Sequence, residues 1–211
     1  MMANLEGALL QGAHLEKANL RRAYLARANL VNAHLEETQL RQAAFDPQTI
    51  LDNIVLHNEK FGCASLADVR WNGANLAVVN WSNVKMLGNE SEARQKKHNG
   101  QVKDRETRLG EFGTAVRANR QLAVELQEQG LNEEAARFAF RAQKLQCEVL
   151  WRQRKFGQYL FSLFLDILAG YGYKPIRSVI CYLVIIFGFA LYASREDLRN
   201  KACLIPPGAG C

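Results

Sequence analysis

The sequence has few of the motifs from which catalytic and metal centres are commonly built. None of its five cysteines forms a CxxC pair, so neither a zinc site nor a disulfide framework is indicated, although Cys203 and Cys211 would be able to bridge outside the cytoplasm. The chain has no phosphate-binding loop, no GxSxG and no HExxH motif. We therefore expect no enzyme, with no catalytic residues, no cofactor and no metal ion.

A strong excess of charge of one sign is also missing. The formal net charge is +6, and residues 1–47 carry five acidic and five basic side chains. Residues 91–155 carry nine acidic and fourteen basic side chains, a modest excess without a basic block. This balance argues against nucleic acid as a partner. The chain also opens without a signal-peptide pattern, which favours a cytoplasmic location for its N-terminal part.

A five-residue period runs through residues 3–47. A large apolar residue recurs at every fifth position, and a small residue, usually alanine, stands two positions before it. These repeat centres are Leu5, Leu10, Leu15, Leu20, Leu25, Leu30, Leu35, Leu40 and Phe45. A period of five spreads the leucines around all faces of a helix, and on a flat strand it sends successive leucines to opposite faces. A coil with one five-residue side per repeat instead points every centre inward.

The repeated units, such as Ala-Asn-Leu at 18–20 and Ala-His-Leu at 13–15, closely resemble the pentapeptide-repeat family. The resemblance implies that residues 1–47 wind into a right-handed quadrilateral β-helix. The alternative is a long Ala/Leu-rich helix, which local propensity favours but the fixed phase does not. On the coil, His14 and His34 face outward one turn apart and would be able to stack. Solvated repeat residues are the favoured interpretation there, and a metal ladder would need further ligands.

Beyond Phe45 the period is interrupted and then resumes. We interpret residues 48–62 as a connector and residues 63–90 as further repeats or a cap. The centres of this second run are Leu66, Trp71, Leu76, Trp81 and Met86. Residues 91–155 are predicted to form a linker and a helical hairpin. Apolar residues recur there at spacings of three and four residues, and Gly130 divides the run into two helices. The hairpin weakly resembles a tetratricopeptide unit; packing against a neighbouring element is the favoured interpretation.

The C-terminal part is the most apolar. Residues 156–175 are predicted to form an interfacial amphipathic helix and a Gly-Tyr hinge, with a core helix of a soluble domain as the alternative. Residues 176–194 are predicted to be a transmembrane helix and residues 195–211 a short tail. Basic residues are more numerous before this span than after it, which favours a cytoplasmic repeat domain at the inner cell membrane. The fold class is therefore mixed: β-helix, α-helical hairpin connector and transmembrane helix.

The helical segments around Arg117–Leu122, Gly130–Ala135 and Leu168–Pro175 resemble bacterial pentapeptide-repeat membrane proteins with an ion-channel-like region, whose second half has no counterpart here. We therefore expect a non-enzymatic, membrane-anchored scaffold that presents its β-helix to a protein partner or to another copy of itself. One alternative is a subunit or remnant of an ion channel. A gyrase-binding DNA mimic is the other, and the neutral coil argues against it.

Overall fold

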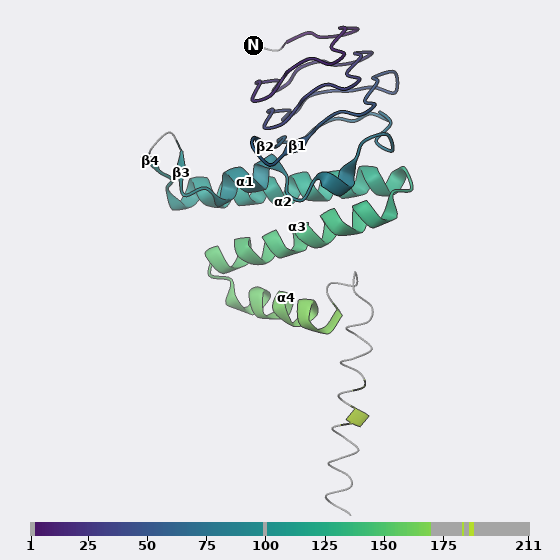
Figure 1. Ribbon diagram of the computed structural model, residues 1–211. Helices are drawn as coiled ribbons and strands as arrows, with labels where there is room; N and C mark the ends of the chain where they lie inside the picture. The colour runs from purple at the N-terminus through teal and green to yellow at the C-terminus, as the bar shows by residue number, and fades with distance from the viewer. Residues whose placement is uncertain (1–2, 99–100, 170–182, 184–185, 188–211) are drawn as a thin grey trace, which may run out of the picture. The chain divides into compact units, whose positions relative to one another are not determined.

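A computed structural model describes residues 3–98, 101–169, 183, 186 and 187. Its contacts divide the chain into two compact units, Met1–Leu160 and Phe161–Cys211. The first unit contains a coil and the three helices that follow it, and the fourth helix crosses from the first unit into the second (Figure 1). The elements in chain order are β1 (His57–Asn58), β2 (Gly62–Cys63), a 3-10 turn η1 (Trp81–Asn83), α1 (Gly88–Arg94), β3 (Lys97–His98), β4 (Gln101–Val102), α2 (Arg105–Glu128), α3 (Asn132–Arg152) and α4 (Phe156–Ala169).

The coil has four sides, and its successive turns pair in parallel. On one side Asn4 pairs with Tyr24, Tyr24 with Ala44 and Ala44 with Arg70. Along this side, the first two turns therefore take 20 residues each and the third takes 26. The backbone N–H groups of each turn donate to carbonyl groups of its neighbours at about 2.9 Å. The other sides pair in the series Leu9–Asn29–Ile50, His14–His34–Val55 and Asn19–Gln39–Ser65.

Most of the repeat centres fill the interior of this coil, in one continuous apolar core. The buried centres are Leu20, Leu25, Leu30, Leu35, Leu40, Phe45, Leu66, Trp71, Leu76 and Trp81, while Leu5, Leu10 and Leu15 in the first turn are partly buried. Met86 differs from the expectation: it is only partly buried, and the next residue, Leu87, is completely buried instead. The five-residue frame therefore ends after Trp81, where η1 replaces the regular turn.

Residues 48–62, predicted as a connector, mostly continue the coil. Leu51 and Leu56 are buried as interior centres, with Thr49 and Ile54 in the small-residue positions two before them. One extra residue at the Asp46–Pro47 turn produces the change of phase. Residues 57–63 then leave the coil as the antiparallel hairpin β1–β2, which adds five residues and so preserves the phase up to Leu66.

Tight turns at the corners of the coil explain the remaining two positions of each repeat. The amide of Ala8 donates to the Leu5 carbonyl at 3.1 Å, and Gly7 at the third turn position has φ +65°. Such turns favour glycine, because a left-handed backbone places a Cβ close to the following carbonyl. Several later turns carry a side chain at this position, for example Lys17 (φ 61°) and Arg22 (φ 59°). Pairing with adjacent turns holds these strained conformations in place.

An aromatic column joins the coil to the helical hairpin within the first unit. Phe45 stacks on Trp71 with ring centroids 5.0 Å apart, and Trp71 meets Trp81 edge-to-face at 6.4 Å. Trp81 in turn contacts Phe138 of α3 edge-to-face at 6.0 Å. Such pairs add about 0.5–1.5 kcal/mol each beyond their buried area. The coil and the hairpin therefore share one core.

Polar side chains of the helices also close the backbone edge at this end of the coil. Gln129, directly after α2, donates from Nε2 to the Ala74 carbonyl at 2.8 Å and accepts from the Leu76 amide at 2.7 Å. Asn89 of α1 accepts from the Leu66 amide at 2.8 Å. The helices thus cap the coil, consistent with a hairpin that packs on a neighbouring element, and they satisfy an edge that would otherwise be exposed for pairing.

The α2–α3 hairpin is present as predicted, whereas the polar stretch before it is more ordered than a linker. Gly130 (φ +80°) ends the turn between the two helices, and α3 begins at Asn132. Helix α1, Gly88–Arg94, crosses the predicted boundary between the cap at 63–90 and the linker that begins at 91, and its Glu90 is 1% exposed. Arg141 of α3 donates to Glu90 at 2.5 and 3.1 Å, and Arg94 donates to it at 2.9 Å. This buried charge is thus fully paired, which explains why a charged segment packs tightly.

Helix α4, Phe156–Ala169, lies within the predicted interfacial segment. None of the helices in the described part of the chain combines the length and apolar character needed to cross a bilayer. The predicted span 176–194 lies outside the described residues except at 183, 186 and 187. The hinge at 170–175 and the tail at 195–211 also lie outside them.

Candidate functional sites

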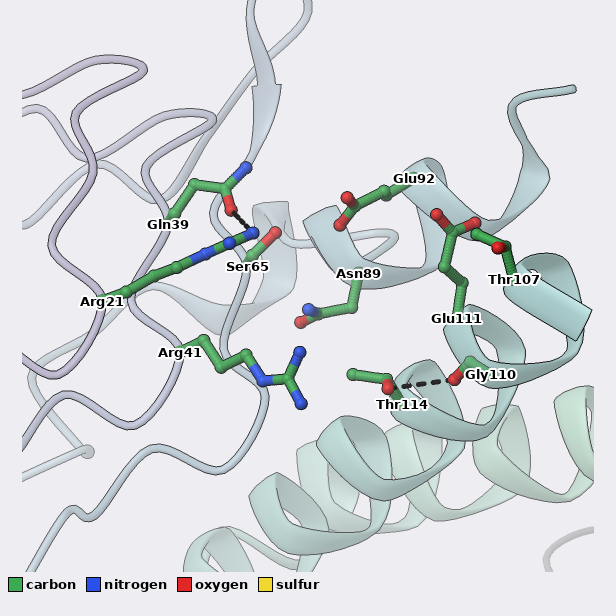
Figure 2. A pocket seen from close by; sticks show the side chains of 10 residues that line it. All are labelled: Arg21, Gln39, Arg41, Ser65, Asn89, Glu92, Thr107, Gly110, Glu111 and Thr114. Atoms are coloured by element: carbon green, nitrogen blue, oxygen red, sulfur yellow. Dashed lines mark hydrogen bonds between the residues drawn. The ribbon is translucent and has the colours of Figure 1, made fainter. Parts of the chain in front are cut away.

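A pocket of about 360 Å³ lies where the coil meets α1 and α2 (Figure 2). Its coil wall carries Arg21 and Arg41, and its helical wall carries Glu92 and Glu111, so the two walls differ in charge. The other lining residues are Gln39, Ser65, Asn89, Thr107, Gly110 and Thr114. These ten residues include no histidine or cysteine to act as a base or nucleophile, and Arg21 is bonded to Gln39. The pocket therefore offers charged and polar groups of both signs for contacts with a ligand.

A second pocket, of about 600 Å³, is strongly basic. It is lined by Lys103, Arg105, Arg108, Trp151, Arg152, Arg154 and Phe156, which come from the segments around the start of α2 and the end of α3. Lys103 is already paired with Glu111 at 2.8 Å. No acidic residue is among the lining residues, so the four arginines give the pocket its positive character.

The arginines of this basic pocket are held in place but incompletely bonded. The Arg152 guanidinium lies 4.5 Å from the centre of the Phe112 ring, and Arg105 donates to the Arg152 carbonyl. The Nε atoms of Arg108 and Arg152 are buried without a hydrogen-bond partner among the described residues. Arginine guanidinium groups that gather beside aromatic rings are suited to binding an anionic group such as a phosphate.

The sequence alone indicated only half of the basic pocket. The run from Trp151 to Lys155 stands out as a basic and aromatic segment. Arg105 and Arg108 join it because α2 and α3 are antiparallel, which places the start of one beside the end of the other. The sequence signal for this proximity is Gly130, which predicts a hairpin. In an antiparallel hairpin the start of the first helix lies beside the end of the second.

On the third side of the coil, two histidines and two glutamates form a ladder. His14 and His34 stack as expected, with ring centroids 4.8 Å apart and planes 11° apart. Nδ1 of His14 donates to Glu16 at 2.9 Å, and Nδ1 of His34 lies 3.4 Å from Glu36. The hydrogen bond to Glu16, together with its charge, raises the pKa of the His14 imidazole, and the same bond lowers the pKa of Glu16.

The geometry of the coil identifies the kind of repeat that builds the N-terminal part of the chain. Four five-residue sides per turn, parallel pairing after 20 residues and large apolar residues, mostly leucine, at the interior centres define a pentapeptide-repeat coil. Residues 3–45 match the family model for pentapeptide repeats, in eight copies. No curated protein matches the chain, and no solved structure matches it. The resemblance to the family is therefore confirmed for residues 3–45, and the resemblance of the C-terminal segments to channel-like proteins stays a prediction.

Proposed function

We propose that the protein is a non-enzymatic scaffold that attaches to a membrane and presents its pentapeptide-repeat coil to a protein partner or to a second copy. The observation that carries the proposal is the basic pocket at the start of α4, where Phe156 and Leu160 are exposed. The coil would then stand on the cytoplasmic side of the inner cell membrane, in keeping with the basic residues that precede the predicted span at 176–194.

Helix α4 has the composition of a segment that lies in a membrane interface. Phe156 is 51% exposed, Leu160 61% and Phe161 63%, so large apolar side chains face outward. A helix of 14 residues is about 21 Å long, whereas the hydrocarbon core is about 30 Å thick. The helix is therefore suited to lie at the surface with its apolar side chains in the acyl region.

The basic pocket would add electrostatic attraction between its arginines and anionic lipid headgroups. Arg105, Arg108, Arg152 and Arg154 gather next to Trp151 and Phe156. A basic residue near an anionic bilayer contributes about 1 kcal/mol, which falls off over a screening length of about 8–10 Å. Arginine with tryptophan is also the combination expected at headgroup depth.

The outward face of the coil supports presentation rather than chemistry. Its exposed side chains pair with one another across turns, as in the ion pair between Arg27 and Glu6 and the bond from Arg22 to Gln42 at 2.9 Å. These pairs give a flat, rigid and nearly neutral surface, which suits recognition by a protein partner.

The proposal is tested by flotation of the full chain with phospholipid vesicles. We expect stronger binding to vesicles containing anionic lipid than to neutral vesicles, and a loss of that preference at high salt. The double variant Arg108→Gln/Arg154→Gln should reduce the preference, whereas the matched coil variant Arg22→Gln/Arg70→Gln should not. Equal binding of all three proteins to both vesicle types would contradict the role of the basic pocket.

Alkaline carbonate extraction of membranes from cells that express the chain tests the anchoring itself. Retention in the pellet supports insertion of the apolar residues beyond α4, and release with preserved vesicle binding supports a peripheral attachment through α4. Recovery in the soluble fraction before extraction would overturn membrane attachment and leave a partner-binding coil.

A further inference from the structure

We propose that the histidine–glutamate ladder on the third side of the coil is a binding site for a divalent transition-metal ion of the Zn²⁺ class. The proposed ligands are His14, Glu16 and His34. The site is independent of the membrane proposal, because it lies on the coil and uses none of the residues of the basic pocket.

The backbone brings these ligands together. His14 and His34 are directly paired in the parallel register of adjacent turns, so their separation is fixed by the coil. One ligand atom from each of His14, Glu16 and His34 can be chosen so that all lie within 4.8 Å of one another. Two donors on one tetrahedral Zn²⁺ ion are about 3.3 Å apart, because each bond is about 2.0 Å long. A metal ion binds an imidazole nitrogen in the plane of the ring, so the two stacked rings must rotate out of their parallel arrangement for both nitrogens to point at one ion.

Glu36 is the second, independent observation that points to a cation. Its side chain is 2% exposed, and its Oε1 lies 3.4 Å from Nδ1 of His34. Its other carboxylate oxygen, Oε2, is buried and has no hydrogen-bond partner among the described residues. A buried carboxylate with an unpartnered oxygen is costly unless a positive charge lies near it. A bound divalent ion would supply that charge.

The second His-x-Glu unit, His34 and Glu36, also provides an ordered outer shell. Metal-binding histidines commonly donate their second ring nitrogen to a carboxylate, which fixes the tautomer and the ring orientation. Glu36 is in position to do this for His34 and is therefore a positioning residue.

The donor set indicates which ions the site prefers. Imidazole nitrogens suit Zn²⁺, Cu²⁺, Ni²⁺ and Co²⁺, whereas Mg²⁺ and Ca²⁺ prefer oxygen ligands alone. Three protein ligands leave a fourth position open for water or for a side chain of a partner. We therefore expect selection of Zn²⁺ over Mg²⁺.

Isothermal titration of the metal-free full chain with Zn²⁺ and Mg²⁺ tests this site. We expect one Zn²⁺ per chain and an affinity about 10–100-fold weaker in the positioning variant Glu36→Gln. The ligand variants His14→Gln and His34→Gln should lose at least as much. His98→Gln, which alters a histidine in β3, serves as the control and should bind as the parent chain does.

The cysteines are the competing source of Zn²⁺ ligands, and Co²⁺ distinguishes the two. Nitrogen and oxygen ligation gives d–d bands without a thiolate charge-transfer band. Binding that survives His14→Gln and His34→Gln but disappears on alkylation of the cysteines would overturn the proposal, as would the absence of Zn²⁺ binding. Circular dichroism of each variant shows that a lost affinity does not arise from unfolding.

Discussion

Gln129 offers a direct test of how the end of the coil is stabilised. Its amide replaces the strand that would otherwise follow, donating to the carbonyl of Ala74 and accepting from the amide of Leu76. Both of these coil residues are completely buried. The substitution Gln129→Met keeps the length of the side chain and removes both hydrogen bonds.

The expected loss of stability follows from the two backbone groups that lose their partner, the carbonyl of Ala74 and the amide of Leu76. A buried donor or acceptor without a partner costs about 1–3 kcal/mol, so two such groups give at most about 6 kcal/mol. Gln129 is only partly buried, and water can reach part of the vacated position. We therefore expect Gln129→Met to lower the free energy of unfolding by about 2–3 kcal/mol.

Urea unfolding monitored by tryptophan fluorescence measures this change, because Trp71 and Trp81 are buried at this end of the coil. The control is Gln127→Met on the exposed face of α2, which should change the stability by less than about 0.5 kcal/mol. Gln129→Glu sharpens the test: it keeps an acceptor for Leu76 but places a carboxylate against the Ala74 carbonyl. We expect this variant to recover part of its stability in acid, where the protonated carboxyl can donate. Equal stability of Gln129→Met and Gln127→Met would refute the capping argument.

Three further substitutions and one chemical reaction test separate parts of the fold. Gly88→Ala would place a Cβ 2.3 Å from the Cys63 carbonyl oxygen and should destabilise the protein by about 1–3 kcal/mol, whereas Gly113→Ala in α2 meets no atom and should stabilise it by about 0.5–1 kcal/mol. Gly12→Ala also meets no atom but has φ +64°, so a loss of about 1–2 kcal/mol is expected; thermal unfolding compares the three. Burial raises the pKa of the Cys63 thiol to about 12, so little thiolate forms at pH 8. Peptide-resolved alkylation should label Cys63 slowly in the native chain and rapidly in denaturant; equal rates would contradict its burial.

The coil was predictable because its signal is local and repeated. Each centre stands at a fixed distance from the next, so the interior from Leu20 to Phe45 can be assigned without knowledge of any distant contact. The same reasoning failed at residues 48–62, where a single extra residue at Asp46–Pro47 changed the phase. Leu51 and Leu56 are in phase with Leu66, and that agreement was the available signal that the coil continues.

The helical cap was harder to predict because its determinants are not local. Glu90 looks like a solvated residue in a polar segment, yet it is buried because Arg141, 51 positions later, pairs with it. Gln129 looks like an ordinary residue at a helix end, and its partners are at 74 and 76. In the ladder, the spacing of 20 between His14 and His34 was visible, but the burial of Glu36 depends on its neighbours in three dimensions.

The fixed cap gives the coil a definite phase relative to the helices. Since one turn takes 20 residues, inserting four repeats upstream would lengthen the coil by one rung of about 4.8 Å and leave every side facing as before. Inserting a single repeat would instead move each upstream side chain by one side of the square. Changes in repeat number can therefore act in two ways in this architecture: multiples of four alter its reach, and all other changes turn its upstream surface to face a different direction.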